Sequence, residues 1–214
     1  MSRRRRYRFY WVASGAVLIW LRIWERFESY GGEHVPSAGG CVIASNHVSF
    51  LDPPAVGCGM RHRVVRFLAR DTLFKPGIPR WFLLNIGCVP IDRTRGDVAA
   101  LRTAINLLRD GHVVALFPEG TRSPDGELKE AKGGVGFLIA KAAVPVVPAY
   151  VDGSFAVYPK GAKRIKRGKV RIFYGKPIDP SEFAPLGHGR DAYEKIGQLV
   201  MSRIAALKPQ ETAR

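Results

Sequence analysis

The sequence has few cysteines, and they lie far apart. Only three occur in 214 residues, at Cys41, Cys58 and Cys88. Their spacing fits no metal-binding pattern, and an odd number at such distances gives no disulfide framework. We therefore expect a reducing compartment, in which the three thiols pack as small apolar groups.

Several functional motifs are also missing. The sequence contains no Gly-x-Ser-x-Gly nucleophile elbow, no helix-turn-helix or zinc pattern, and no aromatic–basic recognition strand. It shows neither an internal repeat nor a low-complexity linker. A chain of 214 residues without such a linker is expected to form one domain with a full hydrophobic core.

Acidic residues are scarce relative to basic ones. The chain has 18 Asp and Glu against 34 Lys and Arg, a formal net charge of +16. Such an excess predicts an anionic partner, either nucleic acid, an anionic membrane surface, a phosphorylated substrate or an acidic carrier protein. Because nucleic-acid motifs are missing, we favour a lipid partner and expect no nucleic acid.

The N-terminal apolar run, residues 9–21, is short. As a helix it spans about 20 Å, against about 30 Å for the hydrocarbon core of a bilayer. Four arginines precede it at 3–6. We therefore expect residues 1–29 to form a membrane-associating helix that lies on an anionic surface. A cleaved signal peptide, a transmembrane anchor and a helix packed on the protein's own core are the alternatives.

The end of this N-terminal segment has an amphipathic pattern. Trp20, Trp24 and Phe27 recur at i, i+4 and i+7, while Glu25 lies away from that face. Aromatic residues beside basic ones suit the membrane interface. We expect the three aromatic side chains to share one exposed face.

From residue 30 to 214, short β-like runs alternate with helical patterns. This alternation predicts an α/β fold, a single domain with a mixed, largely parallel sheet flanked by helices. The segment 160–174 carries seven basic residues around two glycines and is interpreted as a basic hairpin. The expected strands are 41–45, 64–69, 88–91, 113–117 and 146–151, and the expected helices lie near 53–59, 78–86, 97–110, 133–143 and 190–207.

A histidine and an aspartate follow the first of these strands. His47 comes just after the apolar run 41–45, and Asp52 lies five residues later, before two prolines. A carboxylate bonded to one imidazole nitrogen fixes the tautomer and raises the basicity of the other nitrogen. The pair is a candidate general base that acts directly on a hydroxyl. The alternative is a surface histidine beside an aspartate that caps a helix.

A second cluster, residues 117–123, follows the apolar run 113–116. Its backbone N–H groups, hydroxyls and guanidinium suit a phosphate or an oxyanion. A polar turn in which Glu119 pairs with Arg122 is the alternative. Two weaker signals are Arg93, at the end of a β-like run, and Lys132, at the start of an expected helix.

Together these segments resemble the glycerophospholipid acyltransferase family, whose type member acylates lysophosphatidic acid to phosphatidic acid. The resemblance covers residues 33–178 and comprises four blocks in order. The family's Asn-His-x-x-x-x-Asp is matched by Asn46, His47 and Asp52, and its Gly…Ile-x-Arg by Gly87, Ile91 and Arg93. Its Phe-Pro-Glu-Gly-Thr-Arg-Ser is matched at every position from 117 to 123, and its proline-containing apolar run by residues 144–148.

The resemblance implies a role for each block. His47 acts as general base on a glycerol hydroxyl that attacks an acyl thioester, and Asp52 orients it. Pro148 helps to shape the acyl site. The residues implied to position the acceptor's phosphate are Arg93, Glu119, Gly120, Thr121, Arg122 and Lys132. No metal and no cofactor is expected, with acyl-CoA or acyl carrier protein as the acyl-donating co-substrate.

The function implied is that of a 1-acylglycerol-3-phosphate O-acyltransferase of phospholipid biosynthesis. It would bind a lysophospholipid at the cytoplasmic face of the cell membrane. One alternative is an acyltransferase of the same fold that uses another lysolipid, such as a lyso-aminolipid. Another is a non-catalytic lipid-binding protein, against which the presence of both His47 and Asp52 argues. The acyl chain length and the choice of donor stay open.

Overall fold

The computed structural model describes residues 3–91 and 97–210 of the chain. Its strands are β1 (Glu28–Tyr30), β2 (Cys41–Ser45), β3 (Val65–Arg70), β4 (Cys88–Ile91), β5 (Val113–Leu116), β6 (Val146–Asp152) and β7 (Arg171–Tyr174). Its α-helices are α1 (Arg3–Trp24), α2 (Asp52–Cys58), α3 (Ile78–Asn85), α4 (Asp97–Arg109), α5 (Gly133–Ala142), α6 (Ser154–Val157), α7 (Pro180–Phe183) and α8 (Arg190–Ala205).

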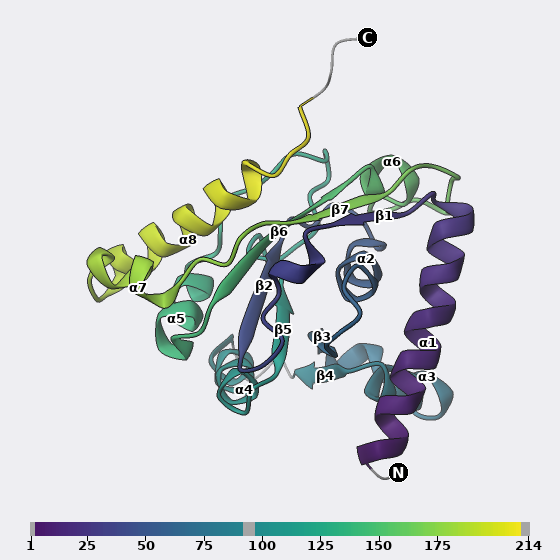
Figure 1. Cartoon of the computed structure of the whole chain (residues 1–214), viewed down its shortest axis with the longest axis horizontal. Helices are drawn as coiled ribbons and strands as arrows, with labels where there is room; N and C mark the ends of the chain where they lie inside the picture. Colours follow the sequence, from purple (N-terminus) through teal and green to yellow (C-terminus); the bar gives the residue numbers. More distant parts are fainter. Residues whose placement is uncertain (1–2, 92–96, 211–214) are drawn as a thin grey trace.

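The strands form one seven-stranded sheet in the order β1-β7-β6-β2-β5-β3-β4 (Figure 1). The five strands from β6 to β4 are parallel to one another. Strand β7 is antiparallel to β6, and β1 is parallel to β7. The expectation of an α/β domain with a mixed, largely parallel sheet is therefore confirmed.

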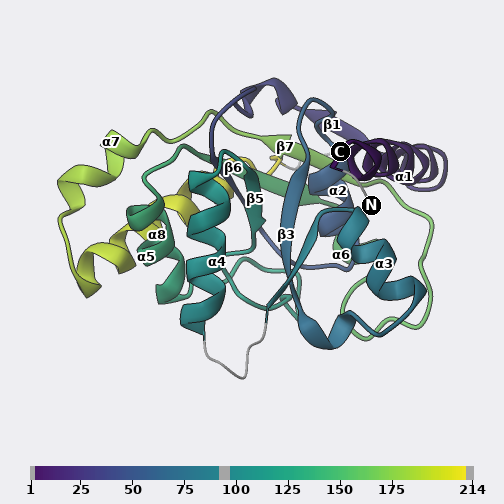
Figure 2. The same cartoon turned by 90° about the horizontal axis from the view of Figure 1, so that it is seen from below.

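Helices cover both faces of the sheet. Figures 1 and 2 show α4, α5 and α8 on one face and α1 and α2 on the other, with α3 beside α1. All five residues of β2 are buried because this central strand is enclosed from both sides. A parallel strand buried on both faces requires an uninterrupted apolar run. The run at 41–45 therefore predicted this strand correctly.

Helix α1 packs on the domain with one face and exposes apolar side chains on the other. Tyr10 and Leu21 are buried, whereas Val12, Ile19 and Ile23 are 71%, 60% and 68% exposed. Within the described ranges, no helix is long and apolar enough to cross a membrane. The helix is thus packed against the protein's own core, one of the alternatives, yet it keeps an apolar outer surface.

The expected shared face of three aromatic residues is wrong in part. Trp20 and Trp24 are exposed on α1, but the helix ends at Trp24 and Phe27 is buried in the core. Glu25, expected to lie away from the aromatic face, is buried and accepts a hydrogen bond from the Gly168 N–H at 3.1 Å. The helical periodicity cannot continue past residue 24 because the chain must turn there to add β1 to the sheet.

All five expected strands and all five expected helices of residues 30–214 are present, and their ends agree with the expected ends within one or two residues.

The prediction of a basic hairpin is wrong. No strand lies within residues 160–170, and residues 171–174 form β7, which pairs with β6 and β1. Like charges placed opposite each other on paired strands are destabilising. The cationic residues of 160–169 therefore stay in a solvated loop, which we call the basic loop. Strands β1 and β7, which pair with each other, were not predicted from the sequence.

Candidate active site

The candidate site lies where three neighbouring strands end. Strand β2 lies between β5 and β6, and all three are parallel, so their carboxyl ends meet at one edge of the sheet. The loop after β2 carries His47, the turn after β5 carries Glu119 and Arg122, and the turn after β6 leads to Ser154. Ligand sites of open α/β sheets form at this edge.

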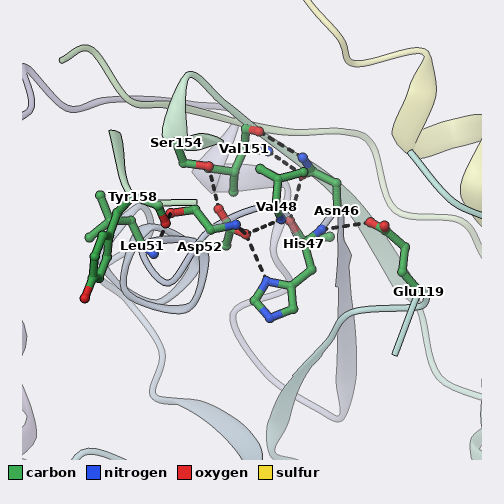
Figure 3. Close-up of polar contacts among 11 residues, drawn as sticks. Asn46, His47, Val48, Leu51, Asp52, Glu119, Val151, Ser154 and Tyr158 are labelled. Carbon is green, nitrogen blue, oxygen red and sulfur yellow. Dashed lines mark hydrogen bonds and ion pairs between the residues drawn. The ribbon is translucent and has the colours of Figure 1, made fainter. Parts of the chain in front are cut away.

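His47 and Asp52 are in direct contact there (Figure 3). His47 Nδ1 lies 2.9 Å from Asp52 Oδ2, and the two side chains are 18% and 0% exposed. An ionised carboxylate only accepts hydrogen bonds, so Nδ1 carries the proton and the lone pair lies on Nε2. Nε2 is on the side of the ring that points away from Asp52. The histidine is thereby arranged to accept a proton from a bound hydroxyl.

Asp52 is held by three further hydrogen bonds. The backbone N–H groups of Val48 and Ser49 donate to Oδ2, each at 2.7 Å, and the Ser154 hydroxyl donates to Oδ1 at 2.6 Å. Val48 and Ser49 precede α2, and Ser154 belongs to α6. The position before α2 is held by Leu51 without a side-chain cap. The alternative of a helix-capping aspartate is therefore wrong.

Sequence reasoning missed Ser154. It lies 102 residues beyond Asp52 in a helix of only four residues, and no local pattern marks its partner. The only signal was its place just after the apolar run 146–151, at the edge where the candidate histidine was expected.

Asn46 ties the ends of β2 and β6 together. Its Nδ2 donates to the Val151 carbonyl at 2.9 Å, and its Oδ1 accepts from the Val151 N–H at 2.7 Å. The amide thus satisfies both backbone groups of a buried strand residue (Figure 3). This pair fixes the β6 end, and with it Ser154, beside the loop that carries His47.

The segment 117–123 holds the backbone of His47 on both sides. Glu119 Oε1 accepts from the His47 N–H at 2.8 Å, and the Ser123 N–H donates to the His47 carbonyl at 2.7 Å. The Phe117 ring stacks on the imidazole, with centroids 4.0 Å apart and planes at 19°. The two sequence clusters therefore form one site.

Glu119 is a buried carboxyl group. Burial raises its pKa above the ordinary value of 4.5, and the hydrogen bond from the His47 backbone opposes that rise. Its second oxygen, Oε2, has no hydrogen-bond partner among the described residues. The alternative of a Glu119–Arg122 pair is not found in that part of the chain, since each side chain has a different neighbour.

Arg122 lies flat on an aromatic ring. Its guanidinium carbon is 3.4 Å from the centroid of the Phe50 ring. Burial lowers the pKa of Arg122, while the negative charge of Asp52 raises it. Nη1 is buried and has no hydrogen-bond partner among the residues that the structure describes. A buried cationic donor without a partner is suited to an anionic ligand.

Gly120, Thr121 and Arg122 are consecutive in the turn after β5, and the Lys132 side chain approaches Gly120. Gly120 has φ +68°, and a Cβ there would lie 2.7 Å from Lys132 Cδ. The positive φ favours glycine at this position, and the lack of a Cβ leaves room for the flexible lysine side chain. The Lys132 N–H donates to the Pro118 carbonyl at 2.9 Å. The Lys132 side chain therefore lies against the backbone of the turn that carries Thr121 and Arg122.

The remaining expected site residues are Arg93 and Pro148. Arg93 falls at 92–96, outside the described residues. Pro148 is buried inside β6 opposite Ala44, and its ring adjoins Gly175 and Leu207 on the α8 side of the sheet. Its role in an acyl site stays a prediction. In the described ranges, no three His, Cys, Asp or Glu side chains are grouped so as to hold a metal ion.

Comparisons with known proteins agree on one family. A family model described as "Acyltransferase" matches residues 26–152. The chain is 30% identical to a 1-acyl-sn-glycerol-3-phosphate acyltransferase of Bacillus subtilis, and the match covers 83% of this chain and 86% of the relative. It is 37% identical to the chloroplastic 1-acyl-sn-glycerol-3-phosphate acyltransferase BAT2 of Brassica napus over 69% of this chain. That match covers only 44% of the Brassica protein.

A solved structure has the same architecture. The crystal structure of the 1-acyl-sn-glycerophosphate (LPA) acyltransferase PlsC from Thermotoga maritima superposes with a TM-score of 0.79 at 26% sequence identity. The match covers 100% of this chain and 86% of the Thermotoga chain. The likeness therefore includes α1 as well as the sheet and its helices.

Proposed function

This chain belongs to the acyltransferase family, and we propose that it transfers an acyl chain from an acyl thioester to the sn-2 hydroxyl of 1-acyl-glycerol-3-phosphate, giving phosphatidic acid. The observation that carries the proposal is the 2.9 Å contact between His47 Nδ1 and the fully buried Asp52 carboxylate. The names of the Bacillus and Brassica relatives support the choice of acceptor.

The proposed reaction is a direct acyl transfer without an acyl-enzyme. The acceptor hydroxyl gives its proton to His47 Nε2 while its oxygen forms a bond to the thioester carbonyl carbon. The carbon–sulfur bond then breaks, and the imidazolium returns the proton to the departing thiolate. Asp52 holds the ring and stabilises the imidazolium. A thioester is activated enough that proximity and a general base suffice.

The acceptor's phosphate is proposed to bind at the cationic turn after β5. Arg122 and Lys132 supply positive charge, and Thr121 supplies a hydroxyl and a backbone N–H; Arg93 and Gly120 are further candidates from the sequence. Arg122 offers N–H donors in a planar fork that matches phosphate. Glu119 is proposed to act here through the His47 loop, because its Oε1 is bonded to that backbone.

The donor is proposed to be acyl-CoA or an acyl carrier protein, with no cofactor. Both donors are anionic, which suits a chain of net charge +16. The basic loop begins two residues after Tyr158, whose carbonyl accepts the Ser49 hydroxyl at 2.7 Å. Its cations are therefore anchored next to the loop that carries His47.

The enzyme is proposed to work on an anionic membrane at the cytoplasmic face of the cell membrane. The exposed apolar side chains Val12, Ile19 and Ile23 on α1 support an interfacial position of that helix. The N–H of Gly168, in the basic loop, bonds to Glu25 just beyond the end of α1, so the cations lie near this apolar surface. Aliphatic and cationic side chains together match the two attractions of an anionic bilayer.

The test is an acyl-transfer assay of the purified full-length protein. Lysophosphatidic acid, a lyso-aminolipid and monoacylglycerol are each supplied with acyl-CoA or acyl carrier protein, and products are identified by mass. We expect phosphatidic acid from lysophosphatidic acid and little product from the others. Equal turnover of the lyso-aminolipid would overturn the acceptor assignment, and binding without turnover of any acceptor would favour a non-catalytic lipid-binding protein.

A further inference from the structure

We infer that Phe50 is a positioning residue that holds Arg122 for the acceptor's phosphate and thereby sets the preference for a phosphate-bearing acceptor. The inference rests on the proposed function for the identity of the acceptor. Phe50 lies between His47 and Asp52 in the sequence. The contact between His47 and Asp52 does not need an aromatic ring at that position. Its side chain is 47% exposed, so core packing does not account for it.

The contact between Phe50 and Arg122 uses the face of the guanidinium and leaves its edge free. The guanidinium carbon lies 3.4 Å from the ring centroid, at stacking distance. All five N–H donors of an arginine lie in the plane of the guanidinium. A ring against the face therefore fixes the plane without using a donor, and the edge can make two parallel bonds to a phosphate.

Arg122 has a donor that lacks a partner. Nη1 is buried and makes no hydrogen bond within the described ranges. Burial lowers the pKa of the group because it disfavours the charged form, and the negative charge of Asp52 opposes this. An anionic oxygen would satisfy Nη1 and offset this cost. The buried donor therefore points to an anionic ligand independently of the aromatic contact.

Phe50 is itself held in place by Tyr158, two residues before the basic loop. The Phe50 N–H donates to the Tyr158 carbonyl at 3.3 Å, and the two rings lie 5.1 Å apart. The Ser49 hydroxyl donates to the same carbonyl at 2.7 Å. A ring with both its backbone and its side chain supported forms a fixed platform, so Arg122 loses less conformational freedom when it binds phosphate.

The test compares Phe50→Leu with Phe50→Trp. Leucine keeps an apolar side chain but has no π face, whereas tryptophan keeps the face. Phe173→Leu is the matched control, because Phe173 also adjoins an arginine, Arg171 at 5.8 Å, but lies on strand β7 and stacks on Tyr30. Two quantities are measured for each protein: steady-state kinetics, and calorimetric binding of a short-chain 1-acyl-glycerol-3-phosphate below its micelle concentration.

We expect Phe50→Leu to raise KM for lysophosphatidic acid and Kd for the short-chain ligand by about 3- to 30-fold. The kcat and the KM for the acyl donor should change less than about twofold, and residual turnover of monoacylglycerol should be unaffected because it has no phosphate. Phe50→Trp should restore KM and Kd, and Phe173→Leu should leave both unchanged.

The inference is overturned if Phe50→Leu binds the short-chain ligand as tightly as the wild type, or if Phe50→Trp is as impaired as Phe50→Leu. It is also overturned if the variant loses monoacylglycerol and lysophosphatidic acid turnover equally. The proposed function fails separately, when the wild-type protein turns over no lysophosphatidic acid. In that event the calorimetric comparison still decides whether the ring positions Arg122 for a phosphate.

Discussion

The carboxylate of Glu119 accepts a hydrogen bond from the backbone N–H of His47, 2.8 Å from Oε1 to the nitrogen. Two residues 72 positions apart are thus joined at the point where the catalytic loop leaves β2. The segment proposed to bind phosphate therefore also supports the proposed general base. A change in either cluster is expected to affect the other.

Removal of the imidazole should abolish acyl transfer and leave the fold intact. His47→Ala deletes the proposed base, whose contribution is of the order of 100- to 10,000-fold. The side chain is only partly buried, so we expect a small change in Tm. Steady-state kinetics and circular dichroism of the purified variant check both parts. A folded variant with wild-type kcat would falsify the mechanism.

Loss of the Ser154 hydroxyl should lower kcat without changing KM. Ser154→Ala removes the hydrogen bond to Asp52 Oδ1 and leaves a buried charged oxygen without that donor. A hydrogen bond to a charged group is worth about 1.5–3 kcal/mol, so kcat should fall roughly 10- to 100-fold. Both constants are measured for lysophosphatidic acid.

Ser154→Thr is the matched control, since it retains the hydroxyl. It should recover most of the kcat lost in Ser154→Ala. If alanine and threonine lower kcat equally, the hydroxyl does not position Asp52, and the effect comes from packing.

Glu119→Gln should change how stability depends on pH. Burial raises the pKa of Glu119 above 4.5, so the folded protein binds this proton more tightly than the unfolded chain. Stability contributed by the group is therefore present at low pH and is lost as the pH rises from about 4.5 through the raised pKa. Glutamine stays neutral and keeps an oxygen that can accept the His47 N–H.

We expect the Tm of Glu119→Gln minus that of the wild type to be near zero at about pH 4 and to become positive at neutral pH. Thermal unfolding across this range measures it. A difference that is the same at every pH would show that the ionisation of Glu119 does not contribute.

The exposed apolar side chains of α1 should drive membrane binding. Replacement of Val12, Ile19 and Ile23 by serine removes solvent-facing apolar surface, so the fraction bound to phosphatidylglycerol vesicles should fall at least about tenfold. Tm should change little because these side chains do not pack in the core. Sedimentation with vesicles measures the binding.

Leu21→Ala is the control on the opposite side of α1. Leu21 is fully buried, so this variant should lose about 2–5 kcal/mol of stability and still bind vesicles while folded. Unchanged partitioning of the triple-serine variant would contradict an interfacial role for α1. Point substitutions are preferable to deletion of residues 1–29, because deletion would also uncover the core beneath Tyr10 and Leu21.

The strands and helices were readable from the sequence because their signals are local. The run 41–45 is continuously apolar since β2 is enclosed on both faces, and α4 shows the 3.6-residue period with Gly111 after its end. Strand β1 was missed for the opposite reason. It has three residues with one intermediate and two exposed side chains, and only pairing with β7 makes it a strand.

Among the site residues, too, those with local sequence signals were predicted and those that depend on distant contacts were not. His47, Asp52 and residues 117–123 were identified because each group is continuous in the chain and directly follows an apolar strand. Phe50 and the partners of Asn46 had no local signal, and Ser154 had only its place after the apolar run 146–151. Their roles arise from contacts across 72 to 109 positions, such as that of Ser49 with Tyr158, and local patterns in a single sequence do not reveal which distant loops meet.

By itself, the sequence determined the α/β class, the candidate catalytic pair and the cationic turn, since strand periodicity and short motifs depend on neighbours in the chain. Only the tertiary structure decided how those groups are used. The parallel register of β6, β2 and β5 places their carboxyl ends together, and there Ser154 bonds Asp52 and Glu119 bonds the His47 backbone. The physical reason is that hydrogen bonds and stacking act over a few ångströms, and only the sheet brings these distant residues within that range.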